Sequence, residues 1–149
     1  MLNALLCAFL FAAPGGEDRA LEPPRPSSTV AAAPPADSVD VARLSPEEAA
    51  AFLAEMPDAV VVDVRTPAEV AASGRLAGAL VLDVTAPNFD ARALDALDLD
   101  RPLLVYCRSG TRAERAARRL AALGITRLAN AGGLDALAAA GLSTEPYTP

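Results

Sequence analysis

The stretch "LLVYCRSGTRAERAARRL" (residues 103–120) decides the fold of this chain, because it joins three local patterns in a fixed order. A short apolar run, typical of a buried strand, ends at Cys107. A loop with one glycine and two arginines follows, and apolar residues then recur at helical spacing. The stretch predicts a buried strand that delivers a thiol to the start of an amphipathic helix.

The same alternation of strand and helix extends to both sides of this stretch. Strands are expected at 59–64, 79–84, 102–107 and 126–130, and helices at 46–56, 66–73, 89–97, 110–124 and 132–141. The first helix carries a start signal, with Ser45 as N-cap, Pro46 at the first position and Glu48 completing a capping box. Strands that are apolar on both faces and alternate with helices are typical of parallel sheets. We therefore expect a three-layer α/β fold with a mostly parallel central sheet of about five strands and helices on both faces.

The amino-acid composition excludes several kinds of catalytic and binding site. The 149 residues suit one domain, and the net charge of −6 argues against nucleic-acid binding. The chain has no histidine, and all 13 cationic side chains are arginine. A histidine base, a histidine metal site and lysine Schiff-base chemistry are therefore excluded. No metal and no organic cofactor are predicted.

The N-terminal part differs from the rest in composition. Residues 2–13, "LNALLCAFLFAA", have the length of the apolar region of a signal peptide and are too short to span a bilayer. We expect a signal peptide at 1–15, a Pro/Ala-rich disordered linker at 16–38 and a folded domain at 39–147. This organisation predicts an exported, periplasmic protein with no membrane span in its mature form. A cytoplasmic chain is the alternative.

Cys107 has the surroundings of a reactive thiol. In parallel sheets ligands bind beyond the carboxyl ends of the strands, and backbone N–H groups at a helix start attract negative charge. Those N–H groups and the neighbouring Arg108 and Arg112 would lower the pKa of the thiol. A buried cysteine that only packs is the alternative. The cationic, glycine-containing loop favours a thiolate held in an anion-binding cup.

Three regions of the chain resemble the signature regions of a single-domain rhodanese, and together they cover about residues 40–145. The matching residues are Asp63, Val64, Arg65 and Glu69, then Gly74, Arg75, Leu76, Gly78 and Ala79, then Cys107, Gly110 and Arg112, and last Gly132 and Gly133. Three positions depart from the family pattern. Arg75 replaces a common histidine, Ala77 replaces a frequent proline, and the aromatic residue usual after the Gly-Gly turn is missing.

The resemblance implies a sulfurtransferase. Its catalytic Cys107 would take sulfur from a small anionic donor such as thiosulfate and pass it, as a persulfide, to cyanide or a thiol, including a protein thiol. The resemblance implies that the loop binds substrate, through Arg108, Ser109, Gly110, Thr111 and Arg112. Asp63, Arg65 and Glu69 are interpreted as structural residues near the site: Asp63 would cap the turn after its strand, and Arg65 would pair with Glu69 or with another acid. The alternative is that Asp63 and Arg65 line the rim of the pocket.

Three alternative functions remain open at this stage. A persulfide carrier without turnover and a regulatory binding module would share the fold. A cysteine-dependent phosphatase or arsenate reductase would need five residues between cysteine and arginine, whereas four separate Cys107 from Arg112. The further arginines of this helix, Arg115, Arg118 and Arg119, are expected on its solvated face.

Overall fold

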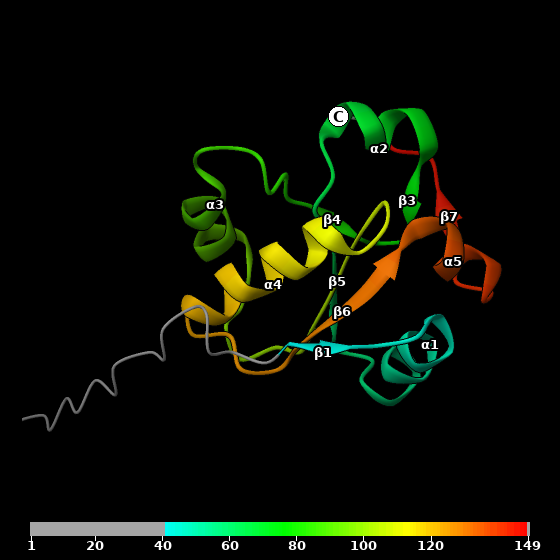
Figure 1. Ribbon diagram of the computed structural model, residues 1–149, viewed down its shortest axis with the longest axis horizontal. Coiled ribbons are helices and arrows are strands. Elements are labelled where there is room, and N and C mark those ends of the chain that lie inside the picture. The colour runs from blue at the N-terminus through cyan, green and yellow to red at the C-terminus, as the bar shows by residue number, and fades with distance from the viewer. Residues whose placement is uncertain (1–40, 149) are drawn as a thin grey trace, which may run out of the picture. The chain divides into compact units, whose positions relative to one another are not determined.

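The structure, a computed structural model, describes residues 41–148 (Figure 1). The predicted signal peptide at 1–15 and linker at 16–38 lie outside the described residues. Five strands form the main sheet in the order β1-β6-β5-β2-β4, and every neighbouring pair is parallel. In chain order these strands are β1 (Ala42–Arg43), β2 (Val60–Asp63), β4 (Leu80–Val81), β5 (Leu103–Cys107) and β6 (Leu128–Gly133). A second, antiparallel sheet pairs β3 (Arg75–Leu76) with β7 (Thr144–Glu145).

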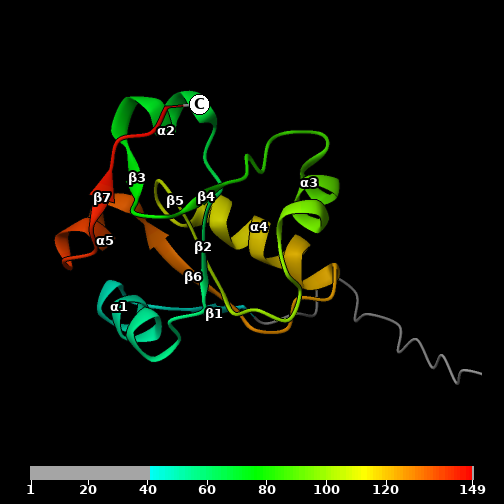
Figure 2. The ribbon, with the colours of Figure 1, turned by 180° about the vertical axis from the view of Figure 1, so that it is seen from behind.

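Helices cover both faces of the main sheet (Figures 1 and 2). The helices are α1 (Pro46–Glu55), α2 (Pro67–Ser73), α3 (Phe89–Ala96), α4 (Thr111–Ala122) and α5 (Leu134–Ala139). Buried side chains of α3 and α4 pack on one face of the sheet, and those of α1 and α5 pack on the other. The prediction of a three-layer α/β fold around a mostly parallel five-stranded sheet is confirmed. Within the described residues no helix is long and apolar enough to cross a membrane.

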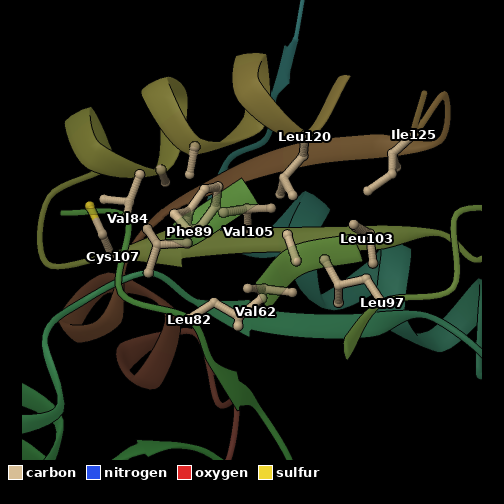
Figure 3. Close-up of a cluster of buried hydrophobic side chains, with 14 residues drawn as sticks. Val62, Leu82, Val84, Phe89, Leu97, Leu103, Val105, Cys107, Leu120 and Ile125 are labelled. Atoms are coloured by element: carbon tan, nitrogen blue, oxygen red, sulfur yellow. The ribbon is translucent and has the colours of Figure 1, made fainter. Parts of the chain in front are cut away.

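Strand β5 lies at the centre of the sheet and contributes to both apolar cores. Successive side chains of a strand point to opposite faces, so Val105 and Cys107 join the core under α3 and α4 while Leu104 and Tyr106 join the other. Figure 3 shows the first of these cores, with Cys107 at one end of the row of buried side chains. Cys107 is therefore anchored in a strand whose residues are all buried.

Two helices begin at capping boxes, and the box at Ser45 confirms the prediction made for that helix. Ser45 Oγ accepts a hydrogen bond from Glu48 N at 3.2 Å, and Glu48 Oε2 accepts one from Ser45 N at 2.7 Å. Thr66 and Glu69 repeat the arrangement at the start of α2. Each box satisfies two backbone donors that a helix start would otherwise leave unpaired.

Several predicted boundaries are wrong. The expected strand 79–84 is reduced to β4, which pairs only with β2, and a turn follows in which the Asp83 carboxylate accepts from Thr85 N at 2.8 Å. The last helix begins at Leu134 rather than at residue 132, because the Gly-Gly pair continues β6 beside Cys107. The two-residue strands β1, β3 and β7 were not predicted.

Candidate active site

Cys107 is the last residue of β5, and α4 begins four residues later. Gly110 is the N-cap of α4 and has φ +95°, a left-handed conformation that glycine adopts without a Cβ clash. This conformation folds the loop back, so that Gly110 N donates a hydrogen bond to Cys107 Sγ at 3.1 Å. The cysteine itself is only 1% exposed. The loop thus wraps the sulfur in backbone donors at a helix start.

The surroundings of the sulfur favour its ionised form. Burial raises the pKa of the Cys107 thiol, but hydrogen bonding from backbone N–H groups outweighs burial and holds the pKa below its usual value. The donors are the N–H groups of Ala113, Ser109, Gly110 and Arg112. A thiol is thereby activated without a histidine, by the dipoles of the loop and the first turn of α4.

Arg112 is held by an acid from another element. Its guanidinium makes two parallel hydrogen bonds to the Glu69 carboxylate, each 2.6 Å long. This pairing lowers the pKa of Glu69 to about 2. The alternative that Arg65 pairs with Glu69 is therefore wrong. The positive charge of Arg112 is therefore held in one position and is partly neutralised by Glu69. The same pair links the start of α4, beside the Cys107 loop, to α2.

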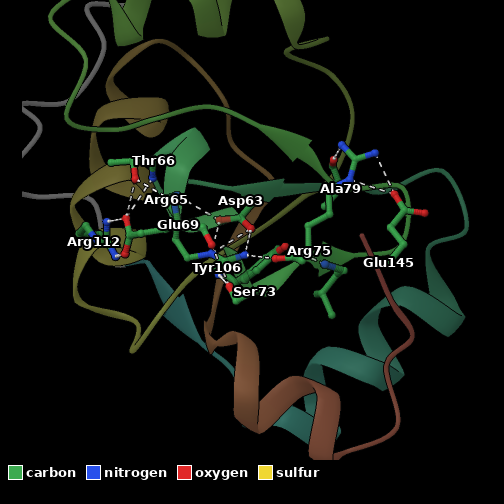
Figure 4. A network of polar contacts seen from close by, with 12 residues as sticks. Asp63, Arg65, Thr66, Glu69, Ser73, Arg75, Ala79, Tyr106, Arg112 and Glu145 are labelled. Atoms are coloured by element: carbon green, nitrogen blue, oxygen red, sulfur yellow. Dashed lines mark hydrogen bonds and ion pairs between the residues drawn. The ribbon is translucent and has the colours of Figure 1, made fainter. Parts of the chain in front are cut away.

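Arg65 instead pairs with Asp63 in the interior. Their side chains are 4% and 0% exposed, and Arg65 Nη2 lies 2.6 Å from Asp63 Oδ2. Arg65 also donates to Ser73 Oγ at 2.7 Å and to the Gly74 carbonyl at 2.6 Å. Figure 4 shows Arg65 close to Asp63 and Ser73. Every polar group of this buried pair has a partner, which is the condition for tolerating buried charge. The pair fixes α2, and with it Glu69, at the end of β2.

A cleft of about 300 Å³ opens beside the loop. Arg65, Glu69 and Ser73 line one side of it, Leu134 and Asp135 of α5 line another, and Arg108 contributes from the loop itself. The residues Arg108, Ser109 and Thr111 are exposed, and Gly110 is buried. Among the loop side chains, Arg108 is therefore placed to meet an anion that enters the cleft.

Three residues that the sequence interpretation did not select as site residues also contact the Cys107 loop. Asn130 is fully buried and donates to the Gly110 carbonyl at 3.2 Å. A Cβ on Gly133 would collide with the Arg108 carbonyl group, and a Cβ on Gly110 would lie 2.8 Å from Arg43 Nη2. The sequence indicates only a turn at the Gly-Gly pair, and sheet pairing reveals that this pair supports the loop. Nothing in the local sequence distinguishes Asn130 or Arg43.

Arg119 departs from its expected position on the solvated helix face. It pairs with Asp90 at 2.9 Å, donates to the Val84 carbonyl at 3.2 Å and stacks over the Phe89 ring at 4.6 Å. Arg115 and Arg118 are exposed, as expected. Arg119 therefore joins α4 to α3 and takes no part in the cleft.

Known proteins are similar to this chain in both sequence and fold. The family model described as "Rhodanese-like domain" matches residues 45–140. A sulfurtransferase of Allochromatium vinosum is 37% identical over 91 residues, which cover 60% of this chain and 81% of that protein. The thiosulfate sulfurtransferase GlpE of Pseudomonas entomophila is 40% identical over 86 residues, covering 58% and 73%.

Among solved structures, the polysulfide-sulfur transferase homodimer of Wolinella succinogenes superimposes with a TM-score of 0.58. It is 28% identical to this chain, and the match covers 72% of this chain and 80% of that one.

Proposed function

This chain belongs to the rhodanese-like domain family, and we propose that it transfers sulfane sulfur from an anionic donor such as thiosulfate to a thiophilic acceptor. Relatives named as sulfurtransferases support a transferase of the rhodanese type. The observation that carries the proposal is the position of Cys107. Its sulfur lies at the carboxyl end of β5, 3.1 Å from a backbone N–H, with its pKa held low by the loop.

In the first half of the proposed reaction, the Cys107 thiolate attacks the outer sulfur of thiosulfate. A Cys107 S–S bond forms, the donor's S–S bond breaks, and the bonding pair leaves on sulfite. The cysteine now carries a persulfide anion. The N–H groups that held the thiolate are available to the persulfide, and Arg108 at the cleft attracts the dianionic donor.

In the second half, an acceptor anion attacks the outer sulfur of the persulfide. With cyanide the product is thiocyanate, and with a thiolate it is a new persulfide. The electron pair of the broken S–S bond returns to Cys107, which is thereby regenerated as a thiolate. No proton, oxidant or reductant is needed in either half, so a site without a histidine base suffices.

The phosphatase alternative is less well supported by the geometry. A phosphatase of the related type needs five residues between its cysteine and its arginine to surround a tetrahedral oxyanion, whereas four separate Cys107 from Arg112. Here Arg112 is already engaged by Glu69 through two 2.6 Å hydrogen bonds. The N–H donors also converge directly on the sulfur atom.

Thiosulfate:cyanide turnover by the wild type and by Cys107→Ser tests the proposal. After thiosulfate exposure we expect a one-sulfur adduct of about 32 Da on the peptide that carries Cys107, its loss on addition of cyanide, and no turnover by the serine variant. Absence of the adduct, or equal activity of Cys107→Ser, would show that the mechanism is wrong. An adduct without turnover favours the persulfide carrier, and hydrolysis of an aryl phosphate favours the phosphatase.

Arg108→Gln tests how the donor is bound. Because Arg108 is exposed and makes no ion pair within residues 41–148, its loss should leave the melting temperature unchanged. We expect KM for thiosulfate to rise about tenfold, as loss of one charged contact implies. Arg115→Gln, an exposed arginine on the neighbouring helix, is the matched control and should leave KM unchanged. An equal effect of both variants would mean that only net charge matters.

We further propose that residues 1–15 direct export of the chain. The apolar run 2–13 and the small residues Ala13 and Gly15 support this. Expression of the full chain in a Gram-negative host should yield a periplasmic protein whose intact mass corresponds to cleavage after Gly15. Recovery of the full-length chain from the cytoplasm would contradict export.

A further inference from the structure

Asn130 is a buried residue whose side-chain amide contacts both the Cys107 loop and the Gly-Gly segment. It lies on β6, beside the central strand that carries Cys107, and it is 0% exposed. Its carboxamide bridges two segments, because Nδ2 donates to the Gly110 carbonyl at 3.2 Å and Oδ1 accepts from Gly132 N at 2.9 Å. The Cys107 loop and the Gly-Gly segment are thereby joined through one side chain.

Glu114 completes the arrangement. Asn130 Nδ2 also donates to Glu114 Oε2 at 3.0 Å, while Glu114 N donates to the Gly110 carbonyl at 2.9 Å. Groups from the helix start and from β6 therefore form a closed set of hydrogen bonds around the Gly110 carbonyl. The side chain of Asn130 uses both its donor and its acceptor, as a buried amide must.

The same glycine is the one whose N–H contacts the sulfur. Gly110 N donates to Cys107 Sγ at 3.1 Å, and its backbone is held at φ +95° with Gly132 Cα close against it. The carbonyl held by Asn130 and the N–H aimed at the sulfur belong to one residue. The two groups lie in adjacent peptide planes that share the Gly110 Cα, so a shift of this Cα when the carbonyl loses its hydrogen bonds would also move the N–H relative to the sulfur.

We propose that Asn130 is a positioning residue, whose carboxamide holds Gly110 and Gly132 in the arrangement that directs the loop N–H groups at Cys107 Sγ. The inference deepens the proposed function and rests on it, since it takes Cys107 as the reacting thiol. Asn130 is neutral and acts through Gly110. The charged groups that face this cluster are Glu114 of α4 and Arg43 of β1, and Arg112 of α4 faces the sulfur itself. All three side chains are retained when Asn130 is replaced, although Glu114 loses the hydrogen bond that Asn130 donates.

The pH dependence of Cys107 alkylation measures the proposed effect without any sulfur donor. Full-length wild type, Asn130→Ala and Leu97→Ala are treated with iodoacetamide between pH 5 and 10. Alkylation is followed on the peptide that carries Cys107, so that Cys7 does not contribute. Leu97 is a buried core residue 6% exposed, and its truncation serves as a control for lowered stability alone.

We expect Asn130→Ala to move the alkylation profile upward by about one pH unit, so that the rate at any pH well below the wild-type pKa of Cys107 falls about tenfold while the plateau at high pH stays unchanged. Leu97→Ala should lower the melting temperature without moving the profile. Glu114→Gln retains an oxygen acceptor for Asn130 and should not move the profile upward. If Asn130→Ala does not fold, Asn130→Ser, which keeps one hydroxyl but cannot bridge both segments, is measured in its place.

A profile for the Asn130 variant that superimposes on the wild type overturns the inference, and so does an equal shift in Leu97→Ala. These outcomes are distinct from failure of the proposed function. If wild-type Cys107 is alkylated with the profile of an ordinary cysteine, or forms no sulfur adduct, then the activated thiolate itself is refuted.

Discussion

Replacement of Gly133 by alanine isolates the contact between the Gly-Gly segment and the Cys107 loop. Gly133 has φ −117° and ψ 146°, an extended conformation that alanine adopts without strain. The added Cβ, however, would press into the Arg108 carbonyl, 3.1 Å from its carbon and closer still to its oxygen, and would lie 3.3 Å from Ser109 Cα. The effect of Gly133→Ala is therefore purely steric, and it falls on the loop that wraps the sulfur.

The size of the effect follows from this geometry. Because a Cβ atom essentially never approaches another heavy atom within 3.0 Å, the Arg108 carbonyl must retreat. Forcing a methyl group into a packed interior costs about 1–3 kcal/mol. The Gly110 N–H, at 3.1 Å from the sulfur, belongs to the same short loop and would move with the carbonyl. A displacement of this kind in a reacting geometry lowers kcat/KM by about 10–100-fold.

Urea unfolding and thiosulfate:cyanide turnover measure the two effects separately, and Gly78→Ala is the matched control. Gly78 has φ +72°, and a Cβ added there would meet nothing within 4 Å. Alanine at this position is therefore strained by about 1 kcal/mol but displaces no neighbour. We expect both variants to lose stability and only Gly133→Ala to lose activity. Wild-type kcat/KM in Gly133→Ala, or an equal loss in Gly78→Ala, would refute the reasoning.

Two predictions concern the acids beside the site. The folded-state pKa of Glu69, about 2, lies below its ordinary 4.5, so its pairing with Arg112 stabilises the fold fully above pH 4.5 and is lost as pH falls toward 2. Glu69→Gln should therefore be less stable than wild type at pH 7 by urea unfolding, with the difference shrinking by pH 2.5; a constant difference would contradict the assigned pKa. Asp63→Ala leaves the buried Arg65 charge without its partner, and it should lower the free energy of unfolding by about 3–5 kcal/mol in the same assay. Asp95 is exposed, and Asp95→Ala should leave this free energy almost unchanged. A loss below about 1 kcal/mol for Asp63→Ala would show that Arg65 finds another partner or water.

Features encoded within a few residues could be predicted from the sequence. The Ser45 and Thr66 helix starts depend on contacts three residues apart, and α4 depends on a periodicity within twelve residues. The apolar strands β2 and β5 could be predicted because helices cover both faces of the sheet there, so neither face needs polar residues. Strands of two residues carry no periodicity, which is why β1, β3 and β7 were not predicted.

Pairings between distant segments could not be predicted in the same way. Both Asp63 and Glu69 lie at plausible spacing from Arg65, and the sequence left its partner open. Only the packing of α2 against the Cys107 loop assigns Glu69 to Arg112 and leaves Asp63 for Arg65. Which acid pairs with which arginine depends on how the starts of α2 and α4 lie relative to each other. The number of residues between them in the sequence does not contain that information.

By itself the sequence determined the α/β fold, the thiol at a strand end and the helix start beside it, because each is set by neighbouring residues. The tertiary structure decided what holds that loop in place. The pairing of β6 with β5 brings Asn130 and Gly133 against Gly110 and Arg108, although Asn130 follows Gly110 by 20 residues along the chain. A cradle of backbone N–H groups has no side chain of its own to fix it, so its geometry depends on the neighbours that only the folded sheet supplies.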